Sequence, residues 1–201
     1  FIQSTLEDKR FCNGERTLLL VCEEGEEEYA PEQFADKSVF VRTVETPEEL
    51  TAENLVKFLA ETQAERVVVE YNGMWMLDRL YGAMPEGWMV YQEFMFADAT
   101  TFLTYNGNMR NLVYDKLKSA ELVIFNRFKP SYEMMDFHKI VRAASRRADI
   151  AYEFEDGHVQ YDEIEDPLPF DLDAPIVEIG DDDFAEWYRD VGEEPKKYED
   201  K

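Results

Sequence analysis

Short apolar runs alternate with segments of helical periodicity along the first 154 residues, and this alternation limits the possible folds. Runs such as 17–22 and 66–71 are continuous and rich in aliphatic residues, which is typical of strands buried on both faces. The expected strands span residues 17–22, 38–41, 66–71, 88–97, 121–126 and 150–154, with a hairpin at Gly157 leading into 159–161. The expected helices span residues 46–63, 74–81, 101–117 and 131–147. This order predicts an α/β protein with a mainly parallel sheet and helices on both faces.

Helix 46–63 carries the clearest start signal. Thr46 is suited to the N-cap, Pro47 to the first helical position, and Glu49 follows the cap by three residues. We therefore expect this helix to begin at Thr46.

Charge excludes two classes of partner. The chain of 201 residues carries 45 acidic and 21 basic side chains, which gives a formal net charge of −24. Such a chain repels phosphodiester backbones and anionic lipid surfaces, so neither a nucleic-acid binder nor a membrane-bound protein is expected. No apolar run approaches the roughly 20 residues that span a bilayer. Cys12 and Cys22 form no metal or redox motif, which favours buried thiols in the cytoplasm.

The acidity is concentrated near the C-terminus. Nineteen acidic and four basic side chains lie in residues 151–201, a region that also contains four prolines. This shift predicts a compact domain over residues 1–166. Residues 167–201 are then an acidic, proline-containing linker with a short helix around Phe184 to Val191, leading to a further domain.

Polar residues follow several of the expected strands. In an open parallel sheet, ligands bind where the carboxyl ends of strands meet helix N-termini. The residues in such places are Glu23, Glu24, Gly25 and Glu26, then Glu70 and Gly73, then Asp98, and finally Asn126, Arg127 and Lys129. Each has a structural alternative as a turn former, a cap or a solvated side chain. Their joint placement is what favours a binding site.

Four of these segments together resemble the CobW/HypB/UreG family of P-loop GTPases. LLLVCEEGE (18–26) resembles the family's second strand and its acidic loop, and RVVVEYNG (66–73) is similar to its Walker B strand. FADA (96–99) and LKSAELVIFN (117–126) are similar to the later strand ends. The resemblance implies a P-loop-NTPase-like, Rossmann-like three-layer sandwich that binds Mg²⁺ with GTP.

The resemblance also implies roles for individual residues. Glu70 would act in catalysis by holding Mg²⁺, and the Gly73 N–H would contact the γ-phosphate. Asn126, Arg127 and Lys129 would bind the nucleotide. Glu24 and Glu26 would bind Mg²⁺ or a transition metal such as Zn²⁺, with plain solvation of an acidic loop as the alternative.

Three departures limit the comparison. No Gly-x-x-x-x-Gly-Lys-Ser/Thr loop is present, and because FIQSTL (1–6) resembles the sequence after that loop, we expect the first strand and the loop to be missing. Lys129 occupies the place of the guanine-binding Asp, so another base is not excluded. The cysteine metal motif is absent near residues 42–46, so a metal would have to be bound by carboxylates, with His138 or His158 as further candidate ligands. Both histidines are expected to be ordinary surface residues.

Two further surfaces have alternative interpretations. Residues 74–96 contain five of the eight methionines, interleaved with aromatic residues. Core packing is expected for most of these methionine and aromatic side chains, with a few exposed ones forming a partner-binding patch. The basic group His138, Lys139, Arg142, Arg146 and Arg147 is expected on the solvated face of a helix.

Three functions remain open at this point. The first is the nucleotide-binding domain of a CobW-like GTPase that couples hydrolysis to metal delivery or to remodelling of a protein client, with a dimer allowed and this chain alone inactive. The second is a non-catalytic binding module on a degenerate P-loop scaffold. The third is an acidic protein that mimics nucleic acid.

Overall fold

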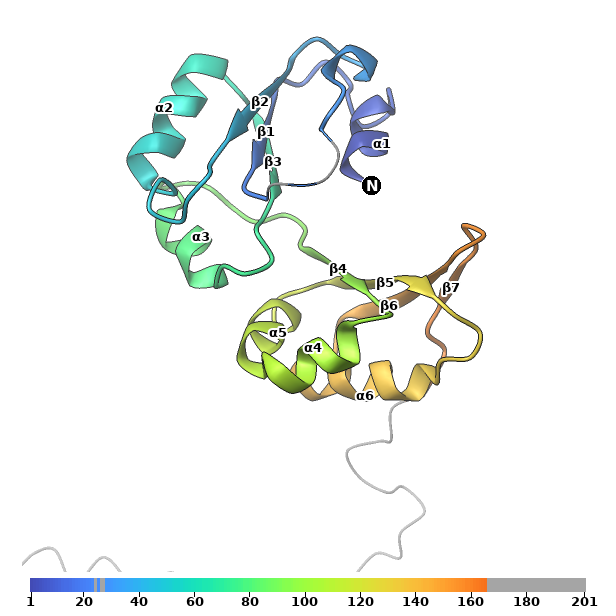
Figure 1. The fold of residues 1–201 in the computed structure, drawn as a ribbon. Helices are drawn as coiled ribbons and strands as arrows, with labels where there is room; N and C mark the ends of the chain where they lie inside the picture. The colour runs from blue at the N-terminus through green and yellow to red at the C-terminus, as the bar shows by residue number, and fades with distance from the viewer. Residues whose placement is uncertain (24, 26–27, 166–201) are drawn as a thin grey trace, which may run out of the picture. The chain divides into compact units, whose positions relative to one another are not determined.

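The computed structural model describes residues 1–23, 25 and 28–165 (Figure 1). The chain divides into two units, Phe1–Ile164 and Glu165–Lys201. The expected helix around Phe184 and the residues Glu24 and Glu26 lie outside the described part. No described helix is both long enough and apolar enough to cross a membrane.

A first sheet of three parallel strands has the order β2-β1-β3. Its strands are β1 (Thr17–Val21), β2 (Val39–Thr43) and β3 (Arg66–Glu70). In the register, Leu19 of β1 lies between Val41 of β2 and Val68 of β3. The helices of this region are α1 (Ile2–Glu7), the 3₁₀ turn η1 (Pro31–Gln33), α2 (Ala52–Thr62) and α3 (Leu77–Ala83).

Both faces of this sheet are covered, as expected. Alternate residues of a strand point to opposite faces. Leu20 packs in a cluster with Leu55 of α2 and Ala83 of α3, whereas Leu19 packs in a second cluster with Leu6 of α1. Figure 1 shows α2 and α3 on one side of the strands and α1 on the other.

A second sheet contains the remaining strands in the order β4-β5-β6-β7. They are β4 (Phe94–Asp98), β5 (Leu122–Phe128), β6 (Asp149–Phe154) and β7 (Val159–Tyr161), and only the β6–β7 hairpin is antiparallel. The helices α4 (Phe102–Asn108), α5 (Arg110–Leu117) and α6 (Met134–Ala144) supply its core from one face. That core is aromatic: Phe125 contacts the rings of Phe102, Phe137 and Tyr152.

Several expected boundaries were wrong. Helix α2 begins at Ala52, because the Thr51 hydroxyl accepts the Asn54 N–H at 3.2 Å, and residues 46–49 form a turn instead. The expected helix 101–117 is broken at Met109 into α4 and α5. The expected strand 88–97 is a strand only from Phe94 onward, and it extends to Asp98. Before it, the side chains of Met89 and Tyr91 are 83% and 86% exposed. Apolar residues alone therefore did not make residues 88–93 a strand.

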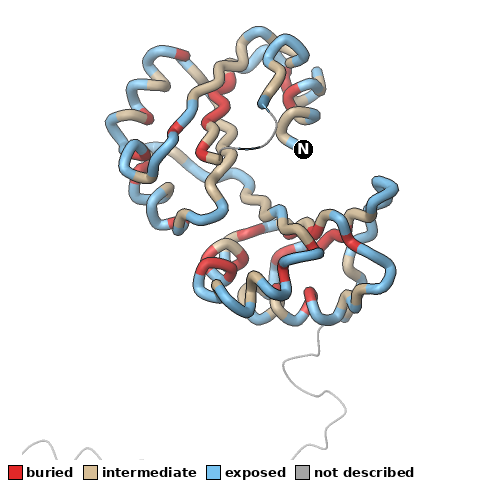
Figure 2. Tube along the Cα trace, viewed as in Figure 1, coloured by how far each residue is buried: buried red, intermediate tan, exposed pale blue. Residues whose placement is uncertain are grey.

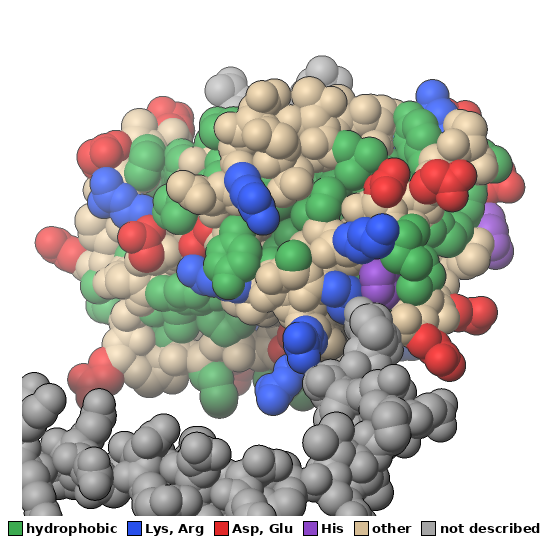
Figure 3. Space-filling model, turned by 90° about the horizontal axis from the view of Figure 1, so that it is seen from below, with side chains coloured by type: hydrophobic (Ala, Val, Ile, Leu, Met, Phe, Trp, Pro, Cys, Tyr) green, Lys and Arg blue, Asp and Glu red, His purple; other side chains and the backbone are tan. Residues whose placement is uncertain are grey.

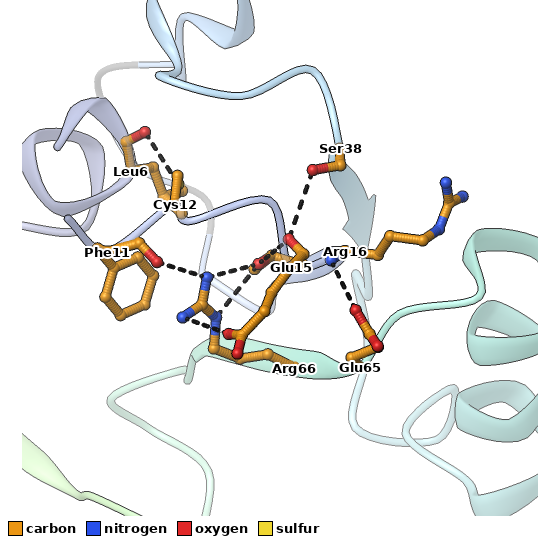
Figure 4. Close-up of polar contacts among 9 residues, drawn as sticks. Leu6, Phe11, Cys12, Glu15, Arg16, Ser38, Glu65 and Arg66 are labelled. Atoms are coloured by element: carbon orange, nitrogen blue, oxygen red, sulfur yellow. Dashed lines mark hydrogen bonds and ion pairs between the residues drawn. The ribbon is translucent and has the colours of Figure 1, made fainter. Parts of the chain in front are cut away.

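The amino ends of the first sheet are closed by a polar cluster around Arg66 (Figure 4). Its guanidinium lies 3.9 Å from the centre of the Phe11 ring, pairs with Glu15 at 3.1 Å and donates to the Phe11 carbonyl at 3.0 Å. The neighbouring Arg16 N–H donates to Glu65. These contacts tie the loop before β1 to the start of β3.

Candidate functional site at the carboxyl ends of the strands

Two strand edges border one large cavity. Within the described residues, β3 pairs only with β1 and β4 pairs only with β5, so each strand has one unpaired edge. A cavity of about 2440 Å³ is lined by both strands, including Val67 to Glu70 and Phe94 to Asp98. The expected single sheet is thus divided into two sheets at this cavity.

The cavity explains why β3 is less buried than its sequence predicts. All five residues of β3 are half-buried, whereas Leu18, Leu19 and Leu20 of the adjacent β1 are completely buried. Figure 2 shows the same contrast along the two strands. On the opposite border, Phe96 of β4 is 44% exposed. The expectation that 66–71 is buried on both sides was wrong because one edge of the strand has no partner.

Glu70 and Gly73 lie at the carboxyl end of β3 and both line this cavity. The Gly73 N–H donates to the Glu23 carboxylate, Oε2, at 2.7 Å. Glu23 follows β1, which pairs in parallel with β3, so two strand ends meet here. The backbone carbonyl of Glu70 accepts the Cys22 N–H at 2.8 Å, which leaves the Glu70 side chain independent of the strand pairing.

The pKa values of two neighbouring groups, Cys22 and Tyr29, are raised beside these carboxylates. Burial raises the pKa of Cys22 to about 12, and the charges of Glu70 and Glu23 add to this effect. Burial and a hydrogen bond to Glu70 likewise raise the pKa of Tyr29. Both groups therefore stay protonated at neutral pH beside the two carboxylates.

Asn126 lies at the carboxyl side of the second sheet and lines the same cavity. It pairs in register with Asp98, and its backbone carbonyl accepts the Ala99 N–H at 3.0 Å. Its side-chain Oδ1 is buried and accepts no hydrogen bond within the described residues. A buried acceptor without a donor costs about 1 to 3 kcal/mol, so this oxygen is suited to a donor from outside the described structure.

Arg127 and Lys129 are not among the residues that line the cavity. Arg127 has a left-handed backbone with φ 53° and pairs with Asp98 at 3.2 Å. Burial raises the pKa of Asp98, but hydrogen bonds from Thr100 and the charge of Arg127 oppose it, and the net effect lowers this pKa. Lys129 lies 4.0 Å from Glu155, and both side chains are exposed. The structure thus brings Glu70, Gly73 and Asn126 to one cavity and leaves these two cations at its outside.

Side chains of α5 contact the segment after Gly73, and the sequence did not predict these contacts. The buried Asp115 accepts the Leu77 N–H at 2.7 Å and pairs with Lys118 at 2.8 Å. Lys116 donates to the Trp75 carbonyl and lies over the Tyr71 ring. These contacts join residues about 40 positions apart, for which no local sequence signal exists.

The methionine-rich segment is more exposed than expected. Met74, Met76 and Met89 are 56%, 41% and 83% exposed, so core packing is wrong for these three of the five methionines. Met89, Val90 and Tyr91 form an exposed apolar loop that also lines the cavity. A partner-binding role for such a loop stays a prediction.

The histidine expectation was wrong for His138. This residue is 3% exposed and its Nδ1 lies 3.0 Å from the buried Asp162, which also accepts the Tyr152 hydroxyl at 2.8 Å. The contacts attach the end of the β6–β7 hairpin to α6, a structural role. His158 is exposed, as expected.

The expected basic helix face is also divided. Arg142 donates to the Ala148 carbonyl at 2.7 Å, and Arg146 and Arg147 follow the end of α6. Figure 3 shows Lys and Arg side chains on the face that it draws, with hydrophobic side chains between some of them. The predicted solvated face is therefore correct only in part.

Metal ligands are sparse in the described structure. No group of three or more His, Cys, Asp or Glu side chains that could hold a metal ion occurs in residues 1–23, 25 and 28–165. Glu70 supplies a carboxylate, which suits Mg²⁺ when phosphate oxygens and water complete the coordination. Cys22 is the only cysteine or histidine that lines the cavity within this part of the chain, which does not fit a Zn²⁺ site.

A search of the solved structures finds the crystal structure of the hydrogenase maturation factor HypB from Archaeoglobus fulgidus. The two chains are 12% identical, the TM-score is 0.50, and the match covers 75% of this chain and 72% of that chain. Comparisons with protein-family models and with curated proteins give no match. At this identity the similarity establishes the fold alone. The chain has a P-loop-NTPase-like α/β fold, which confirms the predicted fold class and, at the level of the fold, the resemblance.

Proposed function

We propose that this chain forms most of the nucleotide-binding domain of a GTPase, in which Mg²⁺-dependent hydrolysis is coupled to metal delivery or to remodelling of a protein client. The observation that carries the proposal is the cavity between β3 and β4, with Glu70, Gly73 and Asn126 gathered around it. A further parallel strand would pair with both free edges, and a phosphate-binding loop after it would reach these residues.

Each of the gathered residues has a part in this proposal. Glu70 holds Mg²⁺ directly or through a water, and the ion supplies charge neutralisation for the phosphates. The Gly73 N–H contacts the terminal phosphate. The buried Oδ1 of Asn126 accepts a hydrogen bond from the phosphate-binding loop or from the base. Arg127 and Lys129, which are exposed, would contact the nucleotide from the rim.

Glu24 and Glu26 would add carboxylates for Mg²⁺, whereas a Zn²⁺ cargo would need ligands beyond the described cavity. We place the protein in the cytoplasm, which suits the two free, buried cysteines. The compact domain would end near residue 166.

A second function, a non-catalytic binding module, is favoured by one observation. The loop of Met89, Val90 and Tyr91 exposes apolar side chains beside the cavity, as surfaces that bind partner proteins do. The two functions differ in whether the cavity takes a nucleotide.

Calorimetric titration with Mg²⁺ and GTP separates them. The chain of residues 1–201 is expected to bind GTP weakly, with a dissociation constant above about 1 mM, because it has no phosphate-binding loop. If the intact protein includes such a strand and loop, it is expected to bind at least about 100-fold more tightly. Equal, weak binding by both chains would favour the binding module.

A further inference from the structure

The Gly73 N–H is a hydrogen-bond donor suited to an anion, and it already donates to a carboxylate. Oε2 of Glu23 accepts this N–H at 2.7 Å across 50 residues of sequence. Hydrogen bonds to an ionised acceptor are about twice as strong as neutral ones. The contact therefore links the carboxyl ends of β1 and β3 at the point where the proposed phosphate would lie.

The loop that carries Gly73 is held by other contacts. The Met74 N–H donates to Oδ1 of Asn72 at 2.8 Å, the Tyr71 hydroxyl donates to the Met76 carbonyl at 2.7 Å, and Asp115 accepts the Leu77 N–H. None of these contacts involves Glu23. If Glu23 moved away, the Gly73 N–H would keep its place and would be available to donate to another acceptor.

The contact with Glu23 does not itself require glycine at position 73. A Cβ on Gly73 would meet Oε2 of Glu23 at 3.7 Å, which is ordinary van der Waals contact. The missing side chain instead leaves the N–H open to a group bulkier than a carboxylate. A phosphate, with three terminal oxygens, is such a group.

We propose that Glu23 is an internal stand-in for the ligand: its carboxylate occupies the Gly73 N–H in the ligand-free protein, and a phosphate oxygen of the nucleotide displaces it. Glu23 then sets the affinity for phosphate by competing for this N–H, whose place is fixed by the other contacts of the loop. This inference rests on the proposed nucleotide function. It adds a regulatory contact between Glu23 and Gly73 that the sequence did not predict.

The test uses the intact protein and three variants. Glu23→Gln keeps the shape and weakens the competing acceptor, and Glu23→Ala removes it. Glu28→Gln removes the same charge from an exposed residue that lines the same cavity, and so controls for general electrostatics. Two quantities are measured: amide hydrogen exchange at Gly73 without ligand, and the dissociation constants of inorganic pyrophosphate and of GTP with Mg²⁺.

Glu23→Ala is expected to speed exchange at Gly73 about tenfold, with exchange at Met74 unchanged because its acceptor is Asn72. Glu23→Gln is expected to lower both dissociation constants about two- to tenfold, because a weaker hydrogen bond must be displaced. Glu28→Gln should leave Gly73 exchange unchanged and should alter affinity less than Glu23→Gln.

Equal or weaker binding by Glu23→Gln, with normal binding by the unmodified protein, would overturn the stand-in role and leave the nucleotide function intact. Unchanged exchange at Gly73 in Glu23→Ala would overturn it as well. Failure of the unmodified protein and of every variant to bind either ligand would overturn the proposed function, and the stand-in role with it.

Discussion

Replacing Glu70 by Gln is expected to lower Mg²⁺-dependent GTP hydrolysis by the intact protein about 10- to 100-fold. The amide cannot supply the negative charge that holds the ion near the phosphates. The fold should be unaffected, because the Glu70 backbone, and not its side chain, pairs with Cys22. Steady-state release of phosphate at several Mg²⁺ concentrations measures the effect.

The matched control is Glu53→Gln, which removes the same charge from an exposed position in the first turn of α2. Its turnover should match that of the unmodified protein. If Glu70→Gln also retained full turnover at every Mg²⁺ concentration, Glu70 would not be part of the site.

Replacing Asp115 by Ala is expected to lower the free energy of unfolding by about 1.5 to 3 kcal/mol at pH 7. The change removes a charged acceptor and leaves the Leu77 N–H, on a residue that is 5% exposed, without its partner. Asp115→Asn is the control, because its Oδ1 can still accept this N–H. Urea unfolding at pH 7 should place the Asn variant between the other two proteins.

The stability difference between the unmodified protein and Asp115→Ala is expected to depend on pH. Burial raises the pKa of Asp115, but hydrogen bonds from Lys118 and the Leu77 N–H together outweigh it, so the net pKa lies below the ordinary value of 3.8. A lowered pKa in the folded state stabilises the protein above the unfolded pKa, and this contribution is lost as the pH falls through the folded pKa. The difference between the unmodified protein and Asp115→Ala should therefore shrink as the pH falls below about 3.8. A difference that grew toward low pH would contradict the assignment.

The strands of the fold could be predicted where they lie inside a sheet. Leu18 to Leu20 and Val123 to Phe125 are continuous apolar runs, and both became paired, central strands. The same reasoning overestimated burial at β3 and the length of β4, since an apolar run does not reveal whether both edges of the strand find partners. Residues 88–93 look like a strand in sequence and are a loop.

The candidate site could be predicted only in outline. Parallel strand ends meet at one side of a sheet, so the approach of the segment after β1, with Glu23, to the segment after β3, with Gly73, follows from topology. The sequence could not show that Glu23 accepts the Gly73 N–H, because several glutamates follow one another after β1 in the sequence. It also could not reveal the contacts of Asp115 and Lys116, which depend on how α5 packs against the segment after β3.

In the proposed function, the cavity between β3 and β4 holds the nucleotide. The most direct test follows the backbone amide resonances of the intact, isotope-labelled protein while GTP and Mg²⁺ are added. Saturable shifts are expected at Gly73, which follows β3 of the first sheet, and at Asn126, which lies in β5 of the second sheet; both residues line the cavity. Shifts confined to residues away from the cavity, or no shifts at saturating GTP, would contradict it.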